Sequence, residues 1–140
     1  MTLFCCTLFL RGAAPRKFSG GNGLATKENV LTKTDDFIKW FLPKIEKFPR
    51  NYRFLVGDRL VEIQLHLLDR LIEAYYRREK LVHLHEANIE IEKLRHLLRI
   101  ATEMRFLSLK QLEYATGELN HIGSLVGGWI RQQEAKHGQG

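Results

Sequence analysis

Glutamate and histidine residues at helical spacing are the side chains of this sequence that could hold a metal ion. Di-metal helical bundles repeat Glu-x-x-His on two helices, and that pattern occurs once here, as Glu118-Leu-Asn-His121. Helical projection turns His121 about 160° away from Leu119, which is expected in the core. The other combinations are Glu62 with His66, Glu92 with His96, and His83-Leu-His85-Glu86. The histidines are predicted to be exposed, with a surface zinc site as the alternative, so no metal or other cofactor is expected.

The sequence lacks the motifs of several enzyme classes. It contains no Gly-rich phosphate loop, nucleophile elbow or His-Glu-x-x-His. The glycines of Val126-Gly-Gly-Trp129 indicate close helix contact or a loosened last turn, and Ser108 and Ser124 form no recognisable triad with a histidine. The sequence therefore predicts a protein that is not an enzyme, and a metal-dependent bundle enzyme is the least favoured hypothesis.

Basic residues form bands on two of the expected helices. Arg59, Arg70 and Arg77 project within about 20° of one another. Guanidinium groups on rigid helices suit phosphate, although the carboxylates beside them also fit a solvated face. Arg95 and Arg99 form a second band. The predicted nucleic-acid or partner-binding residues are Arg59, Arg70, Arg77, Arg95, Arg99, Lys93, Arg105, Lys110 and Arg131.

Length, charge and cysteine content set further bounds. A chain of 140 residues fits one domain with one core. Its net charge is +6, of which residues 1–33 carry +4 (five basic minus one acidic) and residues 34–140 carry +2 (17 minus 15). Cys5 and Cys6 are adjacent and form no disulfide framework, which favours a cytoplasmic location. The apolar run after Met1 is shorter than the roughly 20 residues of a membrane span, so no membrane association is expected.

The pattern of caps, prolines and apolar residues predicts an all-α, antiparallel up-down four-helix bundle. Residues 1–33 are expected to be a mostly unordered basic tail, 34–134 the bundle, and 135–140 a C-terminal tail. Thr34 is the predicted cap of the first helix, Pro43 its kink and Pro49 its boundary. The next helices are expected at about 50–77, 81–106 and 109–133, the last capped by Ser108.

Each later helix has a predicted core stripe. In the second helix, it consists of Phe54, Val61, Leu65, Leu68, Ile72 and Tyr75, with Gly57 allowing close approach of a neighbour. In the third, it consists of Leu84, Ala87, Ile91, Leu94, Leu98 and Ala101. In the fourth, it consists of Leu112, Thr116, Leu119, Gly123, Val126 and Ile130.

Apolar residues outside these stripes exceed what a lone bundle hides, which predicts self-association. The predicted oligomer interface consists of Leu60, Ile63, Leu67, Ile89, Leu97, Ile100 and Met104.

Four stretches carry a resemblance to a known family. They are FLPKIEKFPRNYRFLVGDRL (41–60), LIEAYY (71–76), ANIEIEKLRHLLRIATEMRFLSLKQLEYA (87–115) and IGSLVGGWIRQ (122–132). In these stretches the chain resembles the four-helix-bundle proteins related to those of ribosomal RNA intervening sequences. More specifically, it is similar to Avd, the accessory variability determinant of diversity-generating retroelements. The residues 1–33 fall outside this resemblance.

The resemblance implies a non-catalytic accessory protein that forms a homopentameric barrel with a basic surface. It implies association with the reverse transcriptase of the retroelement and with template RNA or cDNA, in support of mutagenic reverse transcription (mutagenic retrohoming). The alternative is an interaction protein of the intervening-sequence type without a retroelement role.

Overall fold

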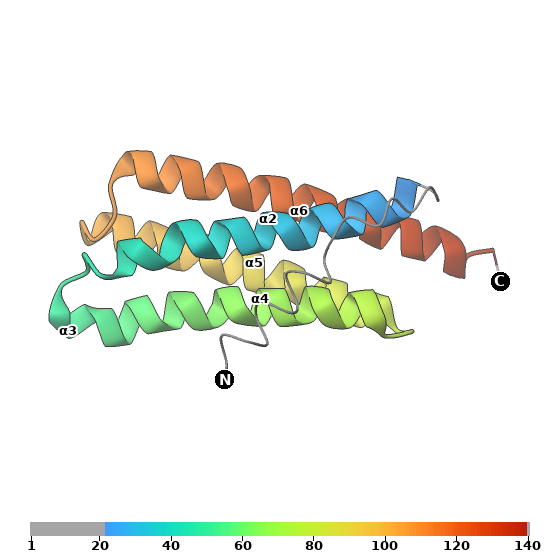
Figure 1. The fold of residues 1–140 in the computed structure, drawn as a ribbon, viewed down its shortest axis with the longest axis horizontal. Coiled ribbons are helices and arrows are strands. Elements are labelled where there is room, and N and C mark those ends of the chain that lie inside the picture. Colours follow the sequence, from blue (N-terminus) through green and yellow to red (C-terminus); the bar gives the residue numbers. More distant parts are fainter. Residues whose placement is uncertain (1–21, 140) are drawn as a thin grey trace, which may run out of the picture.

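The computed structural model describes residues 22–139, which form four long helices and a short connecting segment. The long helices are α2 (Asn22–Ile45), α4 (Asp58–Tyr76), α5 (Lys80–Glu103) and α6 (Leu109–His137). Between α2 and α4, the chain forms the short α3 (Arg50–Tyr52) and a π-helical turn (Arg53–Gly57). The long helices lie side by side, with α2 and α5 each packed against both α4 and α6 (Figure 1). This arrangement confirms the predicted all-α four-helix fold.

The helix α2 begins at Asn22 rather than at Thr34. Thr34 is buried inside the helix, where its Oγ1 donates a hydrogen bond of 2.8 Å to the carbonyl oxygen of Val30. A threonine hydroxyl can thus be satisfied within its own helix as well as at a cap, which the sequence pattern did not distinguish. Residues 22–33 are therefore helical, not part of an unordered tail. The prediction for residues 1–21, including both cysteines, lies outside the described residues.

The predicted corner residues take the expected places. Pro49 is the N-cap of α3. Ser108 caps α6: its Oγ accepts from the Gln111 backbone N–H at 3.2 Å, and its own N–H donates to Gln111 Oε1 at 2.9 Å. Gly57 lies close to α2, because a Cβ at this position would stand 2.7 Å from Ile45 Cγ2. The fourth helix extends to His137, beyond its predicted end.

A lysine closes the corner between α4 and α5. The Nζ of Lys80 donates to the carbonyl oxygens of Ala74, Tyr75 and Arg77, at 2.8, 3.0 and 2.8 Å. These carbonyls belong to the last turn of α4 and to its C-cap, which lack partners further along the helix. Burial lowers the pKa of Lys80, and the positive charges of Lys27 and Lys136 lower it further. Lys80 thus caps the C-terminus of α4, a role that glycine often has at such corners and that no glycine has here.

The buried residues of the bundle confirm the core stripe predicted for α5 and differ from the one predicted for α4. All six predicted core residues of α5 are buried. On α6, Leu119, Val126 and Ile130 are buried, together with Ala115, Ile122 and Trp129, whereas Leu112, Thr116 and Gly123 are partly exposed. On α4, the predicted stripe is wrong. The buried apolar residues there are Leu60, Ile63, Leu67, Leu71 and Ala74.

This correction also changes the predicted oligomer interface. Leu60, Ile63 and Leu67 lie in the core of a single chain, so they offer no surface to another copy. The physical reason is that α4 is apolar over more than half of its circumference, and projection alone could not decide which part faces the other helices. The true core direction lies about 110° from the predicted one. Phe54, Leu65 and Ile72 are consequently exposed.

Candidate nucleic-acid and partner interface

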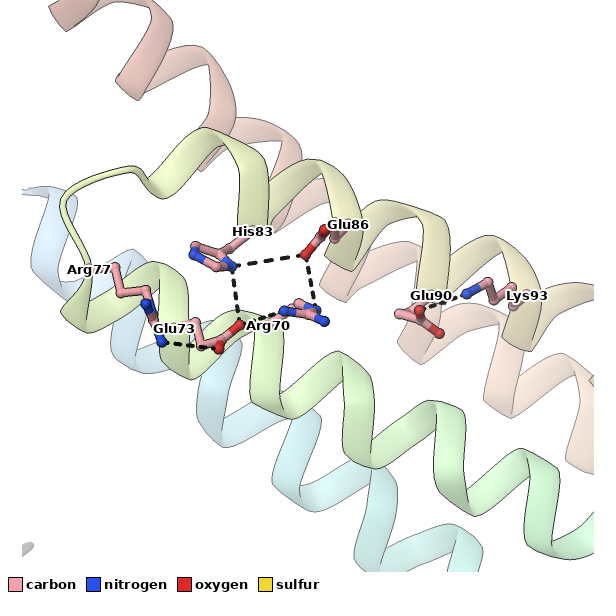
Figure 2. Close-up of polar contacts among 7 residues, drawn as sticks. All are labelled: Arg70, Glu73, Arg77, His83, Glu86, Glu90 and Lys93. Carbon is pink, nitrogen blue, oxygen red and sulfur yellow. Dashed lines mark hydrogen bonds and ion pairs between the residues drawn. The ribbon is translucent and has the colours of Figure 1, made fainter.

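Arginines on α4 are held by carboxylates of α4 and α5 (Figure 2). Arg70 Nη1 lies 2.7 Å from Glu73 Oε2, and Arg70 Nε lies 3.0 Å from Glu86 Oε2. Arg77 Nη2 lies 3.6 Å from Glu73 Oε1. Arg70 therefore links α4 to α5 through Glu86, whereas Arg77 pairs with a carboxylate of α4 itself. To reach a phosphate, Arg70 would first have to leave two carboxylates.

A histidine that the sequence placed on the surface belongs to the same network. The side chain of His83 is only 15% exposed, and its Nδ1 lies 3.1 Å from Glu73 Oε2 and 3.9 Å from Glu86 Oε2. The Nδ1 is buried and lacks hydrogen-bond geometry to either oxygen. Because a neutral imidazole carries no charge, the contact is an ion pair only when the ring is protonated. His66, His85, His96 and His121 are exposed, as predicted.

The remaining histidines and carboxylates do not assemble into a ligand set. Within residues 22–139, no group of three or more His, Cys, Asp or Glu side chains converges in a geometry that could hold a metal ion. In the same residues, no helix combines the length and the apolar content that a membrane span requires.

Other predicted cations are also paired along the helices. Arg59 Nη1 lies 2.5 Å from Glu62 Oε2, and the hydrogen bond and positive charge of Arg59 lower the pKa of Glu62. Lys93 Nζ lies 2.7 Å from Glu90 Oε1. Arg95 pairs with Glu92 and donates to Asn120 Oδ1 of α6 at 3.0 Å. That these residues bind phosphate stays a prediction, and any such contact competes with carboxylates already in place.

Four members of the predicted set are different. They are exposed and have no ion pair with any residue in the described part of the chain: Arg99, Arg105, Lys110 and Arg131. Lys47 and Arg50, which the prediction omitted, share these properties. Arg50 follows Pro49 directly, and Lys47 stands two residues before it, so both belong to the corner that the prolines marked. A helix projection compares the directions of residues within one helix. It therefore could not identify Lys47 and Arg50, which belong to the corner between two helices.

Apolar side chains remain exposed on two sides of the bundle. On α5, Ile89, Ile100 and Met104 are 54%, 48% and 49% exposed, as the interface prediction requires, and Leu97 is half-buried. Leu97 and Ile89 line a groove between α4 and α5 together with Ile63 and Arg59. On the α4 side, the exposed residues are Leu65 and Ile72, both predicted as core, and Tyr76, which was not. Leu42 is exposed on neighbouring α2.

Residues 30–133 match the model of the bAvd-like family, and this span includes most of α2 and α6 and the whole of α3, α4 and α5. The chain belongs to the bAvd-like family. Members of this bacterial Avd family are non-catalytic accessory proteins of diversity-generating retroelements, and membership implies that role for this chain. No curated protein matches the chain. The family match confirms the resemblance that the sequence stretches between 41 and 132 carry.

Proposed function

We propose that this Avd-like protein is the subunit that joins the reverse transcriptase of a diversity-generating retroelement to its template RNA and cDNA, and so supports mutagenic reverse transcription. The family match over residues 30–133 carries this proposal. The subunit supplies surfaces and no reacting group. It acts in the bacterial cytoplasm, where the polymerase and its template are found.

We further propose that the working form is a homo-oligomer, a pentamer as the family resemblance implies. The exposed apolar residues of α5 (Val82, Ile89, Ile100 and Met104, called here the α5 face) support this. So do those of α2 and α4 (Leu42, Leu65, Ile72 and Tyr76, called here the α2–α4 face). Because the two faces differ, one copy can present its α5 face to the α2–α4 face of the next. Such a heterologous, head-to-tail interface generates a ring when the rotation between copies closes.

Charge beside the two faces supports the same pairing. The α5 face adjoins the arginine band of α4, in which Arg59 lines the groove next to Ile89. On the α2–α4 face, Asp58 and Asp69 project beside Leu65 and Ile72 at about 100° per residue. When unlike faces pack, these aspartates can therefore approach Arg59, which would share its charge between them and Glu62.

A reconstitution tests the proposal. The full chain is mixed with the reverse transcriptase of a diversity-generating retroelement and with its template RNA, and complex formation and cDNA synthesis are measured with and without the chain. We expect a stable complex of the three components and cDNA synthesis that depends on the chain. Absence of binding to both the polymerase and the RNA, together with a monomer at micromolar concentration by sedimentation, would contradict the proposal.

A further inference from the structure

Two corners that are far apart in the sequence meet at one end of the bundle (Figure 1). The ring of Tyr52 in α3 lies 5.1 Å from the ring of Phe106, which follows α5, and Phe106 lies 5.5 Å from Phe48. Phe48 is buried, Phe106 is half-buried and Tyr52 is 41% exposed. The three rings thus form a cluster with tilted contacts, in which Phe48 is fixed in the core and Tyr52 is open to water. We call this region, with the residues around it, the α3 end.

Unpaired cations lie on the same two corners as this aromatic cluster. Lys47, Arg50, Arg105 and Lys110 come from the same two corners, and all four are exposed. None of them has an ion pair or hydrogen bond between its side chain and another described residue, Glu46 and Glu103 included. Arg59, Arg70 and Arg95, on the sides of α4 and α5, are instead held by carboxylates. Cations without a carboxylate partner can contact phosphates and release counterions without first breaking an ion pair.

The backbone at the α3 end shows two local departures from regular helix. Arg105 has a φ of 64°, the one positive value among the non-glycine residues described. Arg53–Gly57 forms a π-helical turn. Both kinds of feature cost conformational energy and recur at functional sites. A glycine at position 105 would remove the cost but also the positive charge, so the sequence keeps a cation where the backbone disfavours any side chain.

The corner that carries Tyr52 is also held in place. Arg53 Nη2 donates to the carbonyl oxygen of Glu46 at 2.5 Å and to that of Phe48 at 3.5 Å, across the turn that carries Lys47 and Arg50. Arg53 is therefore a positioning residue. Phe54, on the adjoining π-helical turn, is 70% exposed and offers a second ring near Tyr52 along the chain.

We propose that the α3 end binds single-stranded nucleic acid, with a base stacked on Tyr52 and phosphates on Lys47, Arg50, Arg105 and Lys110. Exposed aromatic rings set among cations are the features by which proteins hold single strands with little sequence preference. A duplex keeps its base faces covered, so the site discriminates against it. This inference rests on the proposed function, because template RNA and cDNA are the single strands that such a subunit would meet.

Fluorescence anisotropy with a labelled single strand of mixed sequence tests the site in the full chain. The probes are single-stranded RNA, single-stranded DNA of the same sequence, and the corresponding duplex. We expect Tyr52→Ala to weaken single-strand binding by at least about 5-fold, the lower bound for loss of one stacked base, and Tyr52→Trp to retain it. We expect weaker binding of the duplex, and the RNA and DNA probes distinguish template from cDNA.

A charge-matched pair of variants tests the location of the phosphate contacts. Lys47→Gln/Arg50→Gln/Lys110→Gln should lower the slope of log Kd against log salt concentration by about 2, at about 0.7 for each single-strand contact. The control Lys27→Gln/Arg78→Gln/Lys136→Gln removes the same charge near the opposite end, where Lys27 and Lys136 lie close to Lys80, and should change the slope by less than half as much. Circular dichroism checks that all variants keep their helicity.

The outcomes separate this inference from the proposed function. A wild-type chain that binds none of the probes would overturn this inference, and the reconstitution with polymerase and template RNA then decides the proposed function separately. A wild-type chain that binds, with Tyr52→Ala unchanged or the two triple variants equal, would overturn only the assignment of the α3 end. Loss of polymerase binding in Tyr52→Ala, with unchanged nucleic-acid affinity, would also overturn it and would assign this end to the polymerase.

Discussion

Arg70 of α4 lies with its Nε 3.0 Å from Oε2 of Glu86, a residue of α5. This ion pair is one of the polar links between the two helices, and Glu73 and His83 surround it (Figure 2). The link assigns Arg70 to the stability of the bundle. Its side chain projects in the same direction as that of Arg59. Arg59 pairs with Glu62 of its own helix, whereas Arg70 pairs with Glu73 of α4 and also with Glu86 of α5.

The first prediction concerns this ion pair. Arg70→Ala should lower the free energy of unfolding by about 0.5–1.5 kcal/mol, because a partly exposed network is worth more than a single surface pair and less than a buried one. Urea denaturation measures the loss, and a double-mutant cycle with Glu86→Gln isolates the coupling. Nucleic-acid affinity should change by less than it does in the α3-end variants. A large loss of affinity with unchanged stability would show that Arg70 is a binding residue.

The sequence predicted α5 well and α4 poorly for a physical reason. On α5, charged residues interrupt the apolar residues opposite the Leu84–Ala101 stripe. Only one side of the helix is therefore continuously apolar, and the direction of the core was clear. On α4, apolar side chains continue from Leu60 round to Leu65, and the direction of the core depends on where α2 and α5 pack. Leu65 and Ile72 of the α2–α4 face were therefore mistaken for core residues.

The candidate sites depend on contacts between separate segments. The pairing of Arg70 with Glu86, and the ring contact of Tyr52 with Phe106, join residues of different helices or corners. No periodicity within one helix reveals them. Two predictions that depend on residues close in the sequence were confirmed. Ser108 caps α6 through Gln111, three residues away, and Gly57 lies against residues of the corner that precedes it.

The second prediction concerns two glycines. Gly57→Ala should destabilise the protein by about 1–3 kcal/mol, because the new Cβ would stand 2.7 Å from Ile45 Cγ2 and force α2 and the π-helical turn apart. Gly117→Ala is the matched control, since a Cβ at this position inside α6 would have no neighbouring atom within 4 Å. That variant should gain about 0.5–1 kcal/mol from helix propensity. Thermal unfolding of both variants measures the difference, and equal effects would contradict the close approach at Gly57.

The third prediction concerns the end of α5. Arg105 occupies the left-handed position of a Schellman motif, in which Phe106 N–H donates to the carbonyl oxygen of Ala101 at 2.8 Å and Arg105 N–H to that of Thr102 at 2.9 Å. Arg105→Gly should raise the free energy of unfolding by about 1 kcal/mol, because glycine adopts this φ without steric cost. The same variant should weaken nucleic-acid binding through loss of one cation. Arg105→Ala, which removes the charge but keeps the strain, should weaken binding without the gain in stability.

The fourth prediction concerns pH. Burial raises the pKa of Asp35 on α2, and Asp36 adds to this effect while Lys39 opposes it. The folded state then binds more protons than the unfolded state between the ordinary and the raised pKa, so stability falls as the pH rises through that window. Asp35→Asn should therefore raise the Tm at pH 7 by about 1–2 °C, a small gain because the carboxylate is largely solvated. The gain should disappear at pH 3, where Asp35 is protonated in both states. An equal gain at both pH values would show that its cause is not ionisation.

The fifth prediction tests which surface joins the copies. Ile100 is 48% exposed on the α5 face, and a lysine there would stand one turn from Glu103, so Ile100→Lys should leave the monomer folded. In an assembled interface, however, the lysine would be buried without a partner, which costs far more than the apolar contact it replaces. Sedimentation velocity at micromolar concentration should show an oligomer for the wild-type chain and a monomer for this variant. Leu109→Lys is the control, because Leu109 is 72% exposed but belongs to the first turn of α6, away from both faces. If Ile100→Lys sediments like the wild type while Leu109→Lys dissociates, the contact between copies lies at the corner before α6 and not on the α5 face.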